Sequence, residues 1–192
     1  MKIFIKNMVS ANCKIIVKSE VEKLGWHSLH INLGEIEITE NLSPEEQNQL
    51  NNNLKKSGLE ILTDKQSILI ERIKTIIIER VHFSEDQIKV NFSTYLSEKL
   101  DYDYTYLANL FSEIQNINIE QFYLSHKIER AKELIIYDEL NITEIADKLH
   151  YSSVGHFSNQ FKKMTGLTPT HYKHLKFKKR KPLVSRQRSY DG

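Results

Sequence analysis

A segment near the middle of the chain recurs about fifty residues later, and this repeat limits the possible folds more than any other feature. Each copy has the pattern of two helices joined by a tight turn, because its apolar residues keep helical spacing on both sides of a short polar stretch. The matched positions, 49 or 50 residues apart, are Ser93 and Thr143, Leu96 and Ala146, Leu100 and Leu149, Tyr102 and Tyr151, Leu107 and Phe157, and Phe111 and Phe161. Ser93 and Thr143 are the expected N-caps of the first helices.

This pattern predicts two helix-turn-helix motifs, at residues 93–115 and 143–164. Repeats of similar length also build solenoids, but a solenoid normally needs three or more copies to bury its core. Only two copies are visible here, which favours a paired module that binds double-stranded DNA.

Several motifs in the second copy resemble the AraC/XylS family of transcription regulators. They are Ile142-Thr143-Glu144-Ile145-Ala146, Tyr151-Ser152-Ser153, His156-Phe157-Ser158-Asn159-Gln160-Phe161-Lys162-Lys163 and Gly166-Leu167-Thr168-Pro169. Arg130-Ala131-Lys132-Glu133-Leu134 resembles the helix that joins the two motifs in that family, so the likeness covers roughly residues 65–178. The resemblance implies a regulator that binds two successive major-groove segments and often contacts RNA polymerase. It does not separate activators from repressors.

The core positions define which side chains of each second helix face outward. The expected DNA-contacting residues are Tyr104, Thr105, Ala108, Asn109 and Ser112 in the first motif, and Ser153, Val154, His156, Asn159, Lys162 and Lys163 in the second. Asn can bind adenine through two hydrogen bonds, and the family often has Arg at these two Asn positions, which favours A·T-rich sites. The alternatives are that both Asn residues contact phosphate or remain solvated. Val154 would suit a thymine methyl group, and the two lysines would suit phosphates.

The charge distribution supports a nucleic-acid partner for the C-terminal part. Residues 1–139 contain 16 basic and 22 acidic residues, whereas residues 140–192 contain 11 and 3. The net charge of +2 therefore conceals a basic C-terminal part, residues 140–192. The basic end of the chain, residues 179–192, is expected to be disordered.

Residues 1–63 show a different pattern. Segments whose apolar residues alternate, as in strands, are followed by segments whose apolar residues have helical spacing. Strands are expected at residues 2–9, 29–33, 36–38 and 59–62, with helices at 11–24, capped by Ser10, and from 43 to 57. This order is the ferredoxin-like plan. An apolar helix at 65–82 follows. The predicted fold is thus an α+β ferredoxin-like domain at 1–63 and an all-α DNA-binding domain at 64–178.

The loop Met8-Val9-Ser10-Ala11-Asn12-Cys13 resembles that of heavy-metal-associated domains such as copper chaperones, in which two cysteines bind a soft metal ion. Ser10 stands where the first cysteine is expected, so Cys13 alone would be a poor site for Cu(I) in a monomer. Two hypotheses remain: a homodimer linked through two copies of Cys13, or a domain that keeps the fold and serves as an interaction surface.

Other functional classes have little support in the sequence. No catalytic constellation or glycine-rich phosphate loop is present, so an enzyme is not expected. The chain has no apolar run long enough to span a membrane and no signal-peptide pattern, so we expect a cytoplasmic protein without a membrane partner. The alternative function is a metal-trafficking or interaction protein with unspecific nucleic-acid affinity.

Overall fold

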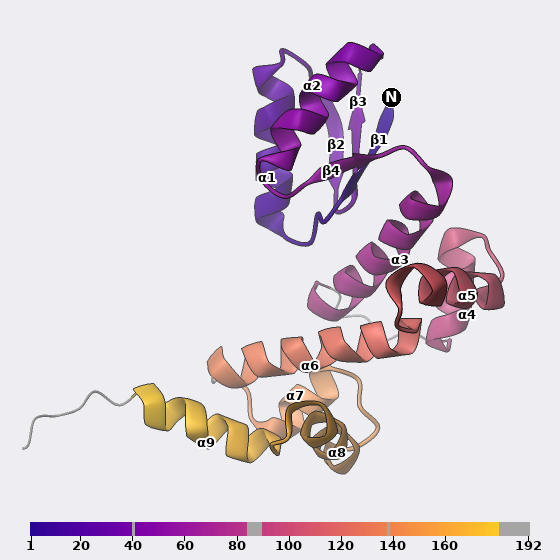
Figure 1. Ribbon diagram of the computed structural model, residues 1–192. Coiled ribbons are helices and arrows are strands. Elements are labelled where there is room, and N and C mark those ends of the chain that lie inside the picture. Colours follow the sequence, from indigo (N-terminus) through magenta and orange to yellow (C-terminus); the bar gives the residue numbers. More distant parts are fainter. Residues whose placement is uncertain (40, 84–89, 138, 181–192) are drawn as a thin grey trace, which may run out of the picture. The chain divides into compact units, whose positions relative to one another are not determined.

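The computed structural model describes residues 1–39, 41–83, 90–137 and 139–180, and the side chains of residues up to 175 (Figure 1). The chain divides into two compact units, Met1–Tyr123 and Leu124–Gly192. The first unit contains the N-terminal sheet and the first helix pair, so this division lies 60 residues beyond the expected boundary at residue 63. Residues 181–192, most of the expected basic tail, lie outside the described part.

The N-terminal part of the first unit is a four-stranded antiparallel sheet with two helices on one face (Figure 1). In chain order its elements are β1 (Lys2–Lys6), α1 (Ala11–Lys23), β2 (Ser28–Asn32), β3 (Glu35–Ile38), α2 (Pro44–Lys55) and β4 (Glu60–Leu62). The strand order is β2-β3-β1-β4. The expected order of strands and helices is therefore confirmed.

The sequence forms this layer because its apolar residues alternate along the strands. Ile3 and Ile5 of β1 point to the helix-covered face and are buried with residues of α1 and α2. Helix α2 starts with a capping box, in which Ser43 and Glu46 each accept a hydrogen bond from the other's backbone N–H. At α1 the expected side-chain cap is absent, because the hydroxyl of Ser10 lies 3.3 Å from the thiol of Cys13 instead.

Helix α3 (Lys65–His82) contacts β1 on one side and the first helix pair on the other. The backbone N–H of Asn7, at the end of β1, donates to the buried carboxylate of Glu71, which also binds Lys74 at 2.8 Å. In the β2–β3 turn, Gly34 has φ +76°, and a Cβ there would lie 2.7 Å from the hydroxyl of Thr75. The turn can approach α3 this closely because its residue is glycine.

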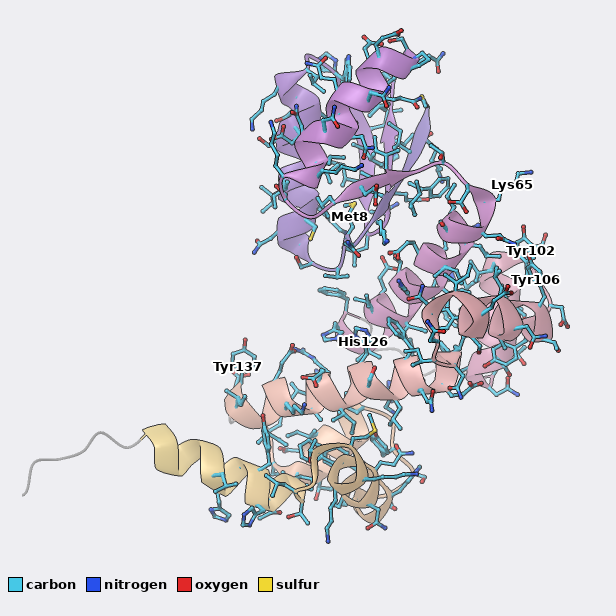
Figure 2. The ribbon with its side chains drawn as sticks, in the orientation of Figure 1. Met8, Lys65, Tyr102, Tyr106, His126 and Tyr137 are labelled. Carbon is cyan, nitrogen blue, oxygen red and sulfur yellow. The ribbon has the colours of Figure 1, made fainter. Side chains whose placement is uncertain are left out.

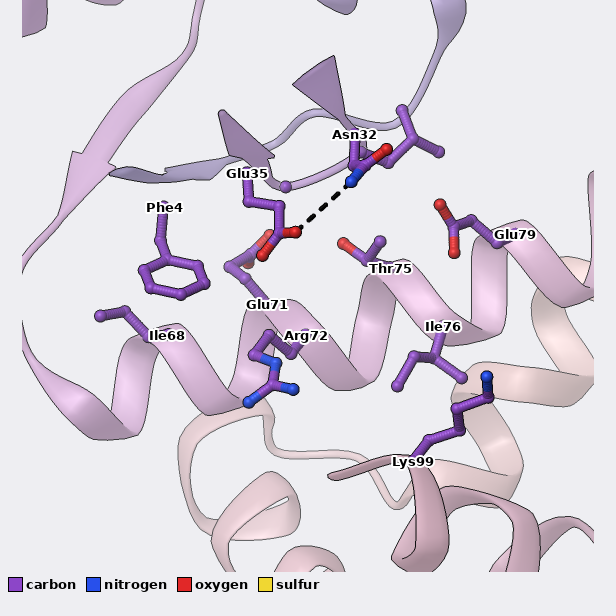
Figure 3. A pocket seen from close by; sticks show the side chains of 12 residues that line it. Phe4, Asn32, Glu35, Ile68, Glu71, Arg72, Thr75, Ile76, Glu79 and Lys99 are labelled. Atoms are coloured by element: carbon purple, nitrogen blue, oxygen red, sulfur yellow. Dashed lines mark hydrogen bonds between the residues drawn. The ribbon is translucent and has the colours of Figure 1, made fainter. Parts of the chain in front are cut away.

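A cavity of about 400 Å³ lies between α3 and the sheet face that carries Phe4 (Figure 3). Its lining combines apolar side chains such as Ile68 with acidic and basic ones. Burial raises the pKa of Glu79, one of the acidic lining residues.

The first helix pair consists of α4 (Phe92–Leu100) and α5 (Tyr104–Gln115), and α6 (Ile119–Tyr137) follows. The core around this first helix pair combines buried residues of α3, α4, α5 and the start of α6. They are Leu69, Ile70, Ile73, Ile77, Leu96, Leu100, Leu107, Leu110, Phe111 and Ile119. The apolar helix expected at 65–82 and the joining helix expected at 119–137 are confirmed with these bounds.

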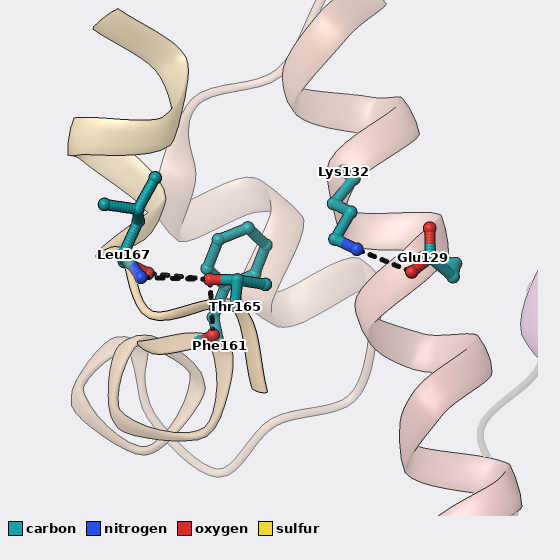
Figure 4. A network of polar contacts seen from close by, with 5 residues as sticks. All are labelled: Glu129, Lys132, Phe161, Thr165 and Leu167. Atoms are coloured by element: carbon teal, nitrogen blue, oxygen red, sulfur yellow. Dashed lines mark hydrogen bonds and ion pairs between the residues drawn. The ribbon is translucent and has the colours of Figure 1, made fainter. Parts of the chain in front are cut away.

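The second unit contains the end of α6, the second helix pair, α7 (Ile142–Lys148) and α8 (Val154–Thr165), and α9 (Pro169–Arg180). Phe157 and Phe161 are fully buried in its core. The turn after α8 is fixed by Thr165, whose hydroxyl lies 2.8 Å from the carbonyl of Phe161 and accepts the N–H of Leu167 at 3.2 Å (Figure 4). Gly166 follows with φ +80°, the left-handed conformation that ends many helices.

Within the described ranges, no helix is both long enough and apolar enough to cross a lipid bilayer.

Candidate DNA interface

The two helix pairs have equivalent turns and caps. In each turn one residue is left-handed, Asp101 with φ 59° and His150 with φ 55°. The next backbone N–H, of Tyr102 or Tyr151, bonds back into the first helix, to the carbonyl of Ser97 or Ala146. Counted back from the turns, Ser97 corresponds to Ala146. Counted from the helix caps Asn91 and Asn141, which are 50 residues apart, Leu96 corresponds to Ala146 as expected.

The caps of the first helices lie two residues before the expected ones. Asn91 accepts the N–H of Thr94 at 2.9 Å, and Asn141 accepts that of Glu144 at 3.0 Å. The carboxylate of Glu144 in turn accepts the backbone N–H of Asn141, which completes a capping box. Ser93 and Thr143 are therefore not the caps, because an Asn side chain already occupies the free N–H groups of each first turn.

The two second helices also begin with matched caps, 50 residues apart. Asp103 accepts the N–H groups of Thr105 and Tyr106 at 2.8 and 3.3 Å, and Ser153 accepts that of His156 at 3.1 Å. Since Asp101 and His150 are 49 apart, the second turn contains one additional residue, as the sequence pattern predicted. Asn109 and Asn159 therefore occupy equivalent positions.

On α5 the structure exposes only part of the expected surface. Thr105 and Asn109 are exposed and Ser112 is half-buried. Tyr104 is half-buried, and its hydroxyl bonds to Glu120; burial and this bond raise the pKa of Tyr104. Ala108 packs against the core. Tyr104 and Ala108 are thus only partly exposed, because both side chains also contribute to the contact of α5 with its neighbours.

Two exposed tyrosines enlarge the surface of α5. Neither Tyr106 nor Tyr102 was expected there; Tyr102, which the sequence matches with Tyr151, lies in the turn before α5. Their exposed fractions are 45% and 47%, whereas Tyr151 is 8% exposed. The two exposed rings stack with centroids 5.6 Å apart (Figure 2). The spacing of four residues between Tyr102 and Tyr106 was the available signal, because it can bring rings onto one side of a helix start.

On α8 the expected surface is more complete. Ser153, His156, Asn159, Lys162 and Lys163 are all exposed. The exception is the residue expected to contact a thymine methyl group. Val154 is half-buried and packs against the core of the second unit, so only part of its side chain is exposed.

The ring of His156 is held in place by the turn before α8. Its Nδ1 lies 3.1 Å from the hydroxyl of Ser152, and its ring meets that of Tyr151 edge to face at 5.4 Å. Sequence reasoning did not assign Ser152 a role. The hydroxyl limits the rotation of an exposed ring at the helix start, where a nucleic acid would approach.

The two surfaces differ in charge. Helix α5 contains no Lys or Arg, and Asp101 and Asp103 precede it. Helix α8 contains Lys162 and Lys163 and no acidic residue. Only the second surface therefore attracts phosphate by charge.

Cys13 lies in the first turn of α1, half-buried. Burial acts to raise its pKa, but hydrogen bonds from Ser10 and from backbone groups outweigh this effect, so that the pKa of Cys13 is lowered. A lower pKa favours the thiolate that soft metals bind. Over the described ranges no three metal-binding side chains of His, Cys, Asp or Glu gather at one point.

Residues 96–174 match a family of helix-turn-helix domains. This part of the chain is therefore similar to helix-turn-helix domains. The chain is 26% identical over 125 residues to the uncharacterised HTH-type transcriptional regulator YtdP of Bacillus subtilis (strain 168). This match covers 64% of this chain and 16% of that protein. It is 32% identical over 93 residues to the uncharacterised HTH-type regulator SAS0078 of Staphylococcus aureus (strain MSSA476), covering 48% of this chain and 12% of that protein.

Among solved structures, the chain resembles the C-terminal domain of AraT, a response regulator from Geobacillus stearothermophilus. The sequence identity is 24%, the TM-score is 0.50, and the match covers 67% of this chain and 97% of that one. The chain therefore spans a small part of its curated relatives but nearly all of a separate C-terminal domain. These matches support the expected helix-turn-helix, DNA-binding character of the C-terminal part. The family match starts at residue 96, so the metal-domain resemblance stays a prediction.

Proposed function

We propose that the protein is a sequence-specific transcriptional regulator of the AraC type, which acts in the cytoplasm and binds two successive major-groove segments of double-stranded DNA. Helix pairs α4–α5 and α7–α8 would be its two helix-turn-helix motifs. The observation that carries the proposal is the equivalence of the two pairs, with caps at Asn91 and Asn141 and again at Asp103 and Ser153. The helix-turn-helix match, residues 96–174, begins within α4 and includes α5, α7 and α8, which supports the proposal.

Selection from a random duplex pool at physiological salt tests this function. Two enriched elements spaced by roughly one helical turn, about 10 base pairs, are expected if both second helices occupy major-groove segments. A pool without enriched sequences would contradict the proposal. It would favour the alternative, an interaction or metal-trafficking protein with unspecific nucleic-acid affinity.

Two variants of α8 separate base contacts from phosphate contacts. Asn159→Ala is expected to change the base preference in one element only. Lys163→Ala is expected to weaken all sequences alike and to reduce the slope of log K against log salt by about one. The two residues would be wrongly assigned if both variants behaved the same way.

We further assign residues 1–63 to the ferredoxin-like plan, on the basis of the strand order β2-β3-β1-β4 and of both helices packing on one face. We propose that this domain is an interaction surface through which the chain forms a homodimer, while the DNA-binding part contacts RNA polymerase. Sedimentation of the full chain at micromolar concentrations tests the first proposal. A monomer at all these concentrations would contradict it.

A metal-linked dimer is the second candidate role of this domain, favoured by the lowered pKa of Cys13. Two thiolates, one from each copy, would form a linear site for Cu(I). Titration with Cu(I) against a competing chelator is expected to show one ion per dimer, and none for Cys13→Ser. Equal affinities of the two proteins would exclude this role.

A further inference from the structure

The two second helices present different chemistry to a nucleic acid. The exposed residues of α5 are uncharged apart from Glu113, and those of α8 include Lys162 and Lys163. A uniform phosphate-binding role for both helices does not fit this difference, because the attraction to phosphate depends on positive side chains.

The start of α5 is unfavourable for phosphate. Asp101 is exposed in the turn, and Asp103 caps the helix with its carboxylate on two backbone N–H groups. The helix N-terminus, which often binds a phosphate, is therefore already occupied by a negative group. A DNA backbone placed at this point would meet two carboxylates.

The same helix start is well suited to uncharged base edges. Tyr106 and Asn109 lie three residues apart on one side of α5, and both are exposed. A tyrosine combines a hydroxyl that can donate or accept with an apolar ring that fits a thymine methyl group. An asparagine amide matches the N6 and N7 atoms of adenine.

Tyr106 is also held in position before any ligand binds. Tyr102 stacks on it with an angle of 21° between the ring planes (Figure 2). Its backbone N–H is bound by Asp103 at 3.3 Å. A side chain that is already ordered loses less conformational entropy on binding.

We infer that the two helix pairs differ in what they bind: Lys162 and Lys163 of α8 bind phosphates, whereas Tyr106 and Asn109 of α5, with Tyr102 behind Tyr106, recognise A·T base pairs. This inference rests on the proposed function and adds a specificity-determining residue to it. The α7–α8 pair supplies most of the salt-dependent affinity in addition to recognising its own element, and the α4–α5 pair supplies sequence preference with little dependence on salt.

The test measures affinity for four duplexes at several salt concentrations. One duplex carries both elements found by selection, two have one element scrambled, and one has both scrambled. For Tyr106→Ala we expect a loss of roughly 5- to 150-fold on the duplex with both elements, as for one mismatched base pair. We expect the same affinity as the wild type where the α5 element is scrambled, and an unchanged salt slope.

Lys163→Ala and Tyr137→Ala are the matched controls. The lysine variant is expected to bind all four duplexes more weakly, with a slope lower by about 0.9. Tyr137 is 69% exposed on α6, outside both second helices, so its loss should change nothing. Tyr106→Phe keeps the ring and removes only the hydroxyl, which separates hydrogen bonding from apolar contact. Thermal unfolding of each variant verifies that the helix pair is intact.

Two results would overturn the inference. If Tyr106→Ala bound all four duplexes like the wild type, the tyrosine face would not contact bases, and a protein partner would be the better assignment. If it weakened all duplexes alike with a lower slope, α5 would bind the backbone. Failure of the proposed function is recognisable separately, because the wild-type protein would then not distinguish the four duplexes.

Discussion

Replacing Phe161 by Ala tests the division of the chain into two compact units. The side chain of Phe161 is fully buried in the core of the second unit. Its ring meets Phe157 at 5.7 Å and Tyr172 at 5.5 Å between centroids, both edge to face. Truncation of such a residue to Ala lowers the free energy of unfolding by about 3–5 kcal/mol, because apolar burial is lost and a cavity is left behind.

That loss is large relative to the stability of a small domain, which is typically about 5–15 kcal/mol. Urea unfolding followed by far-ultraviolet circular dichroism is therefore expected to show an earlier helical transition and, at low urea, weak DNA binding. The single tryptophan, Trp26, packs against the core of the N-terminal sheet and reports on the first unit. Its fluorescence transition should not change in Phe161→Ala.

Phe111→Ala is the matched control, because Phe111 is equally buried but lies in the first unit. It is expected to shift the tryptophan transition to lower urea. The reasoning would be refuted if Phe161→Ala shifted the tryptophan transition as much as Phe111→Ala does. The chain would then unfold as one cooperative body.

Three further changes test individual features. Gly34→Ala should lower the free energy of unfolding of the first unit by about 1–2 kcal/mol because of the left-handed backbone alone, and the close contact with Thr75 should add to this loss. Adding Thr75→Ala to the same chain should restore part of this free energy, as measured by urea unfolding. Asn141→Ala should cost about 0.5–2 kcal/mol in thermal unfolding of the second unit, and Thr143→Ala, which removes no cap, should cost clearly less. Burial lowers the pKa of Lys127 to about 8, against about 10.4 in the unfolded chain. The unfolded chain therefore holds more protons between these values, and stability should rise with pH from about 8 to about 10 in the wild type but not in Lys127→Met; parallel pH profiles of the two proteins would contradict this.

Regular patterns made most elements predictable from the sequence. The alternation of Ile3 and Ile5 and the spacing of Phe157 and Phe161 reflect burial on one face, which depends only on neighbouring residues. The helix bounds at 65–82 and 119–137 follow from the same kind of pattern.

Single positions at helix ends were harder to predict, because several local hydrogen-bonding arrangements compete there. Asn141 with Glu144 forms a capping box, although Thr143 is also a common cap residue. Ser10 was expected to cap α1, but its hydroxyl meets the thiol of Cys13. A choice between such partners depends on the backbone angles of the turn, which spacing does not reveal.

Outward-facing residues were predicted only in part, because a periodic pattern does not identify what packs beside a helix. Tyr104 and Ala108 face neighbouring elements of the first unit, and α6 supplies Glu120 to bind the hydroxyl of Tyr104. Tyr102 and Tyr151 occupy equivalent turns, yet only Tyr151 is buried. Such differences arise from tertiary contacts of each copy of the repeat.

The strand order also has a consequence for the sequence of events in folding. β1 is a central strand, and its partners are distant in the chain: Ile3 faces Ile36 of β3, and Ile5 faces Ile61 of β4. During synthesis the first strand must therefore wait until about residue 62 has left the ribosome before both of its edges are paired. The contacts of α4 with α5 and of α7 with α8 join neighbouring elements, and folding is faster where contacts are local. Although it is made first, the sheet should be the slower part to form, and its unpaired central strand is the segment that a chaperone would have to protect.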